Sequence, residues 1–353
     1  PQSIRPGAGP HNPTLKFIEV PMTTNMQVLL ASRPTGWVTE ENFKIVNTPI
    51  PRPAEGQILV RNHYLSLDPY MRGRMNDTKS YAAKQELDQV MVGGTVGEVV
   101  ESKNPKFKTG DIVVGMYGWQ QYGCSDGTGV NKVDVSRVPM SAYLGVIGMP
   151  GVTAWVGLLD ICQPKAGETV VVSAASGAVG SAVGQIAKLK GCRAVGIAGG
   201  QAKCDYVVNE LGFDACVDYK AGRLNQDLMA ATPDGIDCYF ENVGGEILDA
   251  VLRRTNAFSR IAVCGLISQY NATEPYGVKT FQAILTNRIK VQGFIVSDRL
   301  NLWPQAMTDL AGWVASGKLK YRETVAQGLE NAPKAFIGLL KGQNFGKQLV
   351  KLI

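Results

Sequence analysis

One segment in the middle of the chain constrains its fold more than any other. The β-branched run at residues 169–173 leads into a turn of small residues, and residues 181–189 then carry their apolar side chains on a helical period. Gly177 and Gly180 occupy the second and third glycine positions of a Gly-x-Gly-x-x-Gly pattern, with Ala175 at the first. Such a turn lets the backbone approach a pyrophosphate at the N-terminus of the helix. The segment therefore predicts a dinucleotide site, and the alternative interpretation is a tight packing turn that binds nothing.

The region after the next predicted strand distinguishes the two nicotinamide cofactors. A site for NAD usually has Asp or Glu about 20 residues after the glycine turn, where the carboxylate holds the ribose 2′-hydroxyl. Residues 196–204 contain no acid, and the first one is Asp205. Lys203 is placed to meet a 2′-phosphate instead, although a lysine here can also be an ordinary solvated residue. The sequence favours NADP over NAD.

The strand and helix patterns predict two domains. Residues 25–150 contain short β runs broken by Gly and Pro, which is typical of a compact β-rich domain. Residues 151–314 alternate strands with helical segments, which predicts an α/β fold with a doubly wound parallel sheet. The predicted strands of the two domains are 57–63, 90–100 and 110–115, and then 169–173, 193–197, 215–218, 236–240 and 260–264.

Both ends of the chain lie outside these two patterns. Residues 1–24 contain five prolines and no signal-peptide pattern, so we expect an N-terminal extension that is either disordered or not native to the protein. Residues 315–353 contain a predicted helix at 331–340 and a predicted strand at 348–352. Periodicity does not identify the partner of that strand.

Composition excludes several classes of protein. No stretch approaches the roughly 18 apolar residues of a membrane-spanning helix. The net charge is +6, and the basic residues form no run of the kind that follows a nucleic-acid backbone. The seven cysteines include no Cys-x-x-Cys pair and the chain has only two histidines, His11 and His63, so we expect no metal site and a reducing compartment.

Seven motifs together resemble a known family. They are residues 64–73, 92–97, 148–154, 174–180, 241–245, 264–271 and 342–347. They are similar to the zinc-independent medium-chain dehydrogenases/reductases. Within that superfamily they resemble the alkenal/one oxidoreductases, a family that includes prostaglandin reductases (leukotriene B4 dehydrogenases) and double-bond reductases. The resemblance is strongest to bacterial NADPH-dependent curcumin reductases. The resemblance covers residues 25–353, and residues 1–24 find no counterpart.

This resemblance implies a fold and a set of cofactor contacts. Residues 25–150 would form a GroES-like catalytic domain to which residues 315–353 return, and residues 151–314 would form a Rossmann NADP-binding domain. A cytoplasmic homodimer with a small-molecule substrate, and with neither nucleic acid nor membrane as a partner, is also implied. The implied cofactor-binding residues are Gly177, Ala178, Val179, Gly180, Ser181, Lys203, Tyr219, Asn242, Cys264, Gly265, Leu266, Ile267, Ser268, Tyr270, Phe294, Ile295, Val296 and Asn344.

Three tyrosines are candidates for contact with the substrate. Tyr270 lies just beyond a predicted Rossmann strand, and we expect its hydroxyl to serve as the catalytic hydrogen-bond or proton donor. Tyr64 lies in the catalytic-domain motif, and Tyr81 falls where relatives carry a tyrosine that faces the substrate. Each of the three can also be a core or rim aromatic with a satisfied hydroxyl.

The expected reaction is NADPH-dependent reduction of the carbon–carbon double bond of α,β-unsaturated ketones and aldehydes. Two alternatives stay open at this point. One is an NADPH-dependent quinone oxidoreductase, which uses the same fold without a metal. The other is a protein that binds NADPH without catalysing a reaction.

Overall fold

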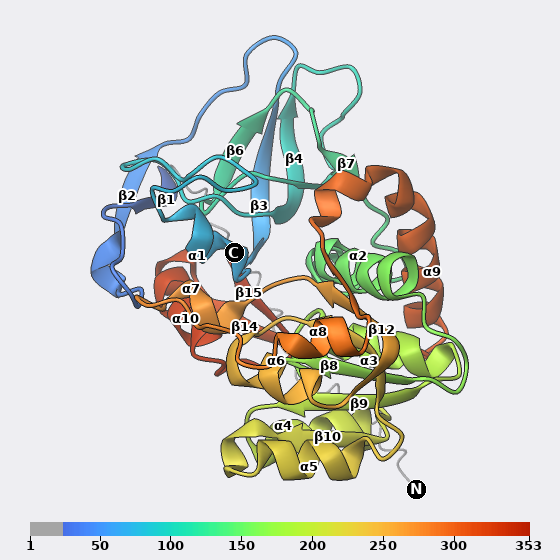
Figure 1. The fold of residues 1–353 in the computed structure, drawn as a ribbon. Helices are drawn as coiled ribbons and strands as arrows, with labels where there is room; N and C mark the ends of the chain where they lie inside the picture. The colour runs from blue at the N-terminus through green and yellow to red at the C-terminus, as the bar shows by residue number, and fades with distance from the viewer. Residues whose placement is uncertain (1–23) are drawn as a thin grey trace, which may run out of the picture.

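The computed structural model describes residues 24–353 and contains two large sheets. Figure 1 shows a predominantly antiparallel sheet in its upper half and a parallel sheet flanked by helices in its lower half, with α7 (Ile267–Tyr270) and α10 (Ala332–Leu340) between them. The predicted extension at residues 1–24 lies, apart from Thr24, outside the described residues. The predicted combination of an α/β Rossmann part with a β-rich catalytic part is confirmed.

The parallel sheet has six strands in the order β10-β9-β8-β11-β12-β13. In chain order this is the 3-2-1-4-5-6 arrangement of a Rossmann fold, in which the strand order reverses between β8 and β11. Val170, Val171 and Val172 of β8 are all buried because helices cover both faces of the sheet. The strands are β8 (Thr169–Ser173), β9 (Arg193–Ala198), β10 (Ala215–Asp218), β11 (Ile236–Glu241), β12 (Thr255–Val263) and β13 (Lys290–Gly293).

Helices cover both faces of this sheet. One core cluster joins α2, α3 and α9 to one face, and another joins α5 and α6 to the opposite face. None of the helices within residues 24–353 is both long and apolar enough to cross a membrane. The helices of this half are α2 (Met149–Trp155), α3 (Gly180–Leu189), α4 (Gln201–Asp205), α5 (Leu224–Ala231), α6 (Gly245–Leu252), α7, α8 (Gln282–Thr286) and α9 (Trp303–Ala315).

The second sheet has seven strands and includes the end of the chain. Its order is β14-β15-β3-β4-β5-β7, and β6 pairs with β3. The predicted terminal strand is β15, and its partners are β3 on one side and β14 on the other. The strands are β3 (Ile58–Ser66), β4 (Thr95–Ser102), β5 (Ile112–Gly115), β6 (Tyr122–Ser125), β7 (Asn131–Lys132), β14 (Glu323–Gln327) and β15 (Lys347–Lys351).

A two-stranded ribbon and two helices complete this half. The ribbon pairs β1 (Thr24–Leu30) with β2 (Phe43–Pro49), and α1 (Tyr70–Arg74) follows β3. Trp119 stacks on Phe43 at a ring distance of 5.4 Å and meets Phe336 of α10 edge-on at 5.7 Å. These aromatic contacts hold the C-terminal helix against the N-terminal sheet, because such rings bury large apolar areas.

The predicted strand at residues 90–100 is wrong in its first half. β4 begins only at Thr95, and Val90 forms an isolated bridge with Leu29. The backbone between them bonds to several other segments instead of one partner strand: Met91 N–H donates to Val28 O, and Ser66 N–H donates to Gly94 O. A Cβ at Gly93 would press on Leu65 and Trp119, so this glycine allows the backbone to approach the core closely.

Candidate active site

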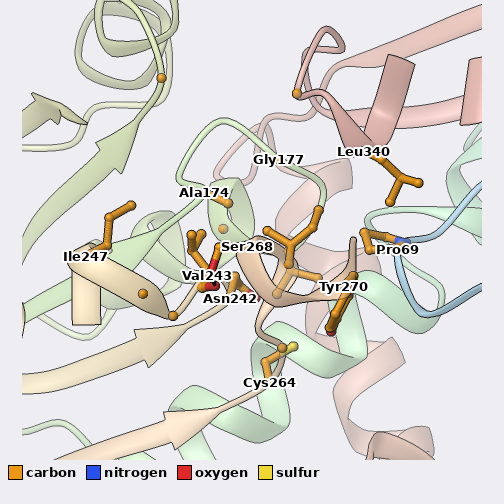
Figure 2. A pocket seen from close by; sticks show the side chains of 18 of the residues that line it. Pro69, Ala174, Gly177, Asn242, Val243, Ile247, Cys264, Ser268, Tyr270 and Leu340 are labelled. Atoms are coloured by element: carbon orange, nitrogen blue, oxygen red, sulfur yellow. Dashed lines mark hydrogen bonds between the residues drawn. The ribbon is translucent and has the colours of Figure 1, made fainter. Parts of the chain in front are cut away.

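A cavity of about 1200 Å³ lies at the carboxyl ends of β8 and β11, where the strand order of the Rossmann sheet reverses. This is the position at which open α/β sheets bind ligands. Figure 2 shows Ala174, Gly177 and Asn242 on loops of the Rossmann half and Ser268 and Tyr270 of α7, while Pro69 and Leu340 come from the other half. Both halves of the molecule therefore line one site.

The glycine turn after β8 forms one wall of this cavity. Ala174 adopts a left-handed conformation with φ of 50°, and Gly177 N–H donates to its carbonyl at 2.9 Å. A Cβ at Gly180 would overlap that same carbonyl oxygen, so only glycine lets α3 start this close to the strand. Gly177, Ala178, Val179 and Gly180 all line the cavity. The first turn of α3 thus presents backbone to the site, as a pyrophosphate requires.

A cluster of cationic side chains lies at the edge of the cavity beside β9. Lys203 Nζ donates to Gly342 O at 2.5 Å and lies 5.5 Å from the centre of the Phe345 ring. Burial, and to a smaller extent the charge of Lys220, lower the pKa of Lys203 from its usual value. Tyr219 lines the same region and is 42% exposed. Two ammonium groups and a phenol hydroxyl at one place fit a dianionic 2′-phosphate.

The turn after β11 is held by a buried carboxylate. Glu241 Oε1 accepts hydrogen bonds from the backbone N–H groups of Val243 and Gly244, from Ser173 Oγ and from the Tyr239 hydroxyl. Burial raises the pKa of Glu241 from its usual value. Asn242 lines the cavity, and its side-chain amide donates to Ser173 O at 2.9 Å. Glu241 thereby ties the ends of β8 and β11 together and places Asn242.

The loop after β12 brings Tyr270 to the cavity. The Tyr270 hydroxyl accepts the backbone N–H of Leu266 at 3.3 Å, which leaves its own proton free to be donated into the site. Burial is the largest cause that raises the pKa of Tyr270, and the neighbouring Cys264 and Tyr81 raise it further. Burial also raises the pKa of Cys264 to about 12, so its thiol is neutral at physiological pH. Residues 264–270 therefore present uncharged groups to the cavity, and because Ser268 Oγ already donates to Val243 O, the Tyr270 hydroxyl is the one whose proton is free.

Aromatic side chains form the part of the cavity that faces the N-terminal half. Trp37, Tyr70 and Tyr81 all line it, together with Met149. The Arg74 guanidinium lies between two of these rings, 5.6 Å from the centre of Tyr70 and 5.2 Å from that of Tyr81. Flat, apolar walls of this kind fit a conjugated organic substrate.

The structure brings most of the sequence-predicted site residues to this cavity, but three lie elsewhere. Tyr64 is on β3 and packs against Val96, Leu144 and Leu349, so we leave it out of the proposed substrate site. Ser181 is buried behind the glycine turn, where its N–H donates to Gly177 O. Leu266 lines an adjacent cavity of about 440 Å³. The predicted residues that do line the main cavity are Gly177, Ala178, Val179, Gly180, Lys203, Tyr219, Asn242, Cys264, Gly265, Ile267, Ser268, Tyr270, Phe294, Ile295, Val296 and Asn344, with Tyr81 on the substrate side.

Sequence reasoning missed several residues of the site. Lys220 directly follows Tyr219, and this adjacency could have indicated it. Glu241 begins one of the family motifs, and its position directly after a predicted strand could have indicated it. Trp37, Tyr70 and Met149 carry no periodic or compositional signal, because only the fold brings them to the cavity.

No metal centre is found in the described part of the chain. Within residues 24–353 no group of three His, Cys, Asp or Glu side chains is placed to hold a metal ion. The seven cysteines are all free thiols. The expectation that the protein works without a metal stays a prediction.

Comparisons with known proteins identify the relatives of this chain. Two family models match, "N-terminal domain of oxidoreductase" over residues 26–133 and "Zinc-binding dehydrogenase" over residues 178–312. The NADPH-dependent curcumin reductase of Escherichia coli is 50% identical over 334 residues, which cover 93% of this chain and 97% of that protein. The NADP-dependent 2-alkenal reductase of Nicotiana tabacum is 46% identical, with the same coverage. The crystal structure of CurA in complex with NADPH from Vibrio vulnificus has a TM-score of 0.89 and 52% identity, and covers 93% of this chain and 99% of that one.

Proposed function

The chain belongs to the medium-chain dehydrogenase/reductase superfamily, in the group that contains curcumin reductase and 2-alkenal reductase, and from this premise we propose that it is an NADPH-dependent enone reductase. It would reduce the carbon–carbon double bond of α,β-unsaturated ketones and aldehydes. The single observation that carries the proposal is the Tyr270 hydroxyl, free to donate, in the same cavity as the glycine turn and the lysine pair.

The residues present fit NADPH in three places. The backbone at Gly177–Gly180 would hold the pyrophosphate, because this turn lines the cavity at the start of α3, and glycine at position 180 lets the helix begin close to β8. Lys203, Tyr219 and Lys220 would hold the 2′-phosphate. Cys264 and Phe294 would line the nicotinamide with uncharged groups. When bound, NADPH supplies a hydride to the electrophilic β-carbon of the substrate.

The side chains of this protein have two tasks in such a reaction. Addition of a hydride to the β-carbon places negative charge on the carbonyl oxygen as an enolate, which needs a hydrogen-bond donor and then a proton at the α-carbon. Tyr270 would supply the donor, since its raised pKa keeps the hydroxyl protonated at neutral pH. Trp37, Tyr70 and Tyr81 would orient the conjugated system and displace water from it.

The test of this function is a substrate panel with a product analysis. We expect NADPH to be consumed with enones and enals, and mass spectrometry and NMR to show the saturated ketone or aldehyde with its carbonyl intact. An allylic alcohol as product, turnover with quinones alone, or NADPH binding without any turnover would each contradict the proposal. The last two outcomes would favour the quinone oxidoreductase and the non-catalytic protein, respectively.

We also propose that the protein is a cytoplasmic homodimer, and one face of the Rossmann half supports the dimer. Within residues 24–353, β13 is an edge strand that pairs only with β12. Leu285 of α8 is 78% exposed, and Phe281, Val291 and Leu300 are also exposed large apolar side chains. An exposed sheet edge beside apolar side chains is typical of a surface that another chain covers.

Light scattering checks the dimer. We expect the mass of two chains at micromolar concentration, and a shift towards one chain when Leu285→Glu places a charge on the exposed face. Met229→Glu is the matched control, because Met229 is also an exposed apolar residue but lies on α5, at the opposite end of the sheet. A monomeric wild-type protein would refute the homodimer.

A further inference from the structure

A buried guanidinium joins the two halves of the molecule next to the candidate site. Arg72 of α1 is only 3% exposed, and its three nitrogens donate to two distant segments and to a residue just beyond its own helix. Nε donates to Asn271 Oδ1 at 2.9 Å, one terminal nitrogen to Asn76 Oδ1 at 2.6 Å, and the other to Gly36 O at 2.8 Å. Asn271 belongs to the Rossmann half, and the other two acceptors belong to the N-terminal half.

The hydrogen bonds of Arg72 are strong and directional. Within residues 24–353 no carboxylate forms an ion pair with this guanidinium, so its acceptors are neutral oxygens of side-chain amides and a backbone carbonyl. A hydrogen bond from a charged donor is stronger than one between neutral groups, and the planar fork fixes the directions of its acceptors. A buried cation cannot exchange these acceptors for water. Arg72 therefore holds its own helix, the segment at Gly36 and the segment at Asn271 in one arrangement.

The segment that needs this support most contains Tyr270. Asn271 follows Tyr270 directly, at the end of α7, which is a single turn of four residues. One helical turn is not stable by itself, so its position depends on tertiary contacts. On its Rossmann side, Ile267 and Ser268 donate to the carbonyls of Asn242 and Val243. On the opposite side, the Asn271 side chain is anchored by Arg72.

The same guanidinium also places the substrate-side walls. Gly36, whose carbonyl accepts from Arg72, directly precedes Trp37, and Tyr70 begins the helix that carries Arg72. Trp37 and Tyr70 line the same cavity as Tyr270. One side chain thus sets the distance between the aromatic walls and the hydroxyl donor.

We propose that Arg72 and Asn271 are positioning residues that hold Tyr270 at the substrate across the boundary between the two halves. The proposal rests on the proposed function, in which Tyr270 donates a hydrogen bond to the enolate oxygen. A small displacement of a catalytic group is enough to lower turnover, even though the group itself is still present. A residue that acts only by positioning Tyr270 should have little effect on turnover once the Tyr270 hydroxyl has been removed.

A double-mutant cycle tests this role. Asn271→Ala should lower kcat on a simple enone on the order of tenfold, because a misplaced donor stabilises the transition state less well. The Kd for NADPH, measured by fluorescence titration, should stay within about twofold of the wild-type value, since the residues proposed to hold the phosphates lie on the glycine turn and at Lys203 and Lys220 and not on α7. In the Tyr270→Phe background, Asn271→Ala should cost less than about twofold in kcat. Asn271→Asp, which keeps an acceptor oxygen for Arg72, should restore most of the lost turnover.

Two further variants separate positioning from general destabilisation. Asn76→Ala is the matched control, because it removes another acceptor of Arg72 but leaves the contact with the Asn271 loop, and kcat should stay near the wild-type value. Arg72→Lys keeps the positive charge but loses the planar guanidinium, so it should reproduce the kcat loss of Asn271→Ala. It tests the same contact from the other side if Asn271→Ala does not fold.

The outcomes distinguish this proposal from the proposed function. If Asn271→Ala lowers kcat by the same factor with and without the Tyr270 hydroxyl, the positioning role is overturned. An equal loss of kcat in Asn76→Ala would overturn it as well. Neither result would affect enone reduction by the wild-type enzyme. A Tyr270→Phe enzyme that turns over at the wild-type rate would also overturn it, because Arg72 and Asn271 could not then act through that hydroxyl. A wild-type enzyme that reduces no enone would overturn the proposed function itself.

Discussion

Replacing Tyr270 by Phe is expected to lower kcat for enone reduction roughly 10- to 1,000-fold without abolishing it. The substitution removes the one hydroxyl that the β12–α7 loop places in the cavity free to donate, so the enolate loses a hydrogen-bond donor. Water can still protonate an enolate, which is why residual turnover should persist. Steady-state kinetics at saturating enone measure the loss, and the Kd for NADPH should stay close to the wild-type value.

The same hydroxyl predicts a pH dependence. An unperturbed tyrosine has a pKa of about 10 and donates only while protonated. Because burial raises the pKa of Tyr270, the donating form persists to higher pH than for an exposed tyrosine. We therefore expect that ionisation of the Tyr270 hydroxyl does not lower kcat between pH 7 and about 9. A decline in that range that disappears in Tyr270→Phe would show that the hydroxyl ionises below its usual pKa and would contradict the raised pKa.

Tyr143→Phe is the control for this prediction. Tyr143 donates its hydroxyl to Asp134 O at 2.5 Å and does not line the cavity. Removing this hydroxyl should leave kcat unchanged. If Tyr270→Phe behaves in the same way at saturating enone, the assignment of the proton donor is wrong.

Replacing Lys203 by Ala should weaken NADPH binding by about 1–3 kcal/mol, the usual range for a charge-assisted hydrogen bond. This corresponds to an increase of about 5- to 150-fold in Kd. Lys203 and Lys220 lie close enough for the charge of one to lower the pKa of the other, and the dianionic 2′-phosphate would relieve that repulsion. Affinity for NADH, which lacks this phosphate, should barely change.

Fluorescence titration with both cofactors checks the result. Lys188→Ala is the control, because Lys188 pairs with Asp214 away from the cavity and its loss should affect neither cofactor. Equal weakening of NADPH and NADH by Lys203→Ala would mean that Lys203 holds the C-terminal segment through Gly342 and does not bind the phosphate.

The features that the sequence determined by itself are those whose physical cause is local. A buried strand, a turn that excludes side chains and an amphipathic helix follow one another within 20 residues at 169–188, and the structure has β8, the glycine turn and α3 at these positions. The preference for NADP over NAD also follows from the sequence alone, because it rests on the absence of an acid after the next strand and on the presence of Lys203. The family motifs added the remaining cofactor-binding candidates, and most of them line the cavity because parallel strands bring their carboxyl ends to the same edge of the sheet.

Only the tertiary structure decided which distant residues meet. Periodicity indicated a strand at the end of the chain, but its pairing with β3 joins residues nearly 300 positions apart and leaves no trace in either segment. Tyr64 and Tyr70 lie in one motif, yet the first packs against the sheet core and the second lines the cavity, because β3 ends and α1 begins between them. The contact of Arg72 with Asn271 spans 199 residues. The pattern of residues within a segment predicts the conformation of that segment. The geometry of a site depends on how the segments pack against one another, and the packing is determined by the whole core.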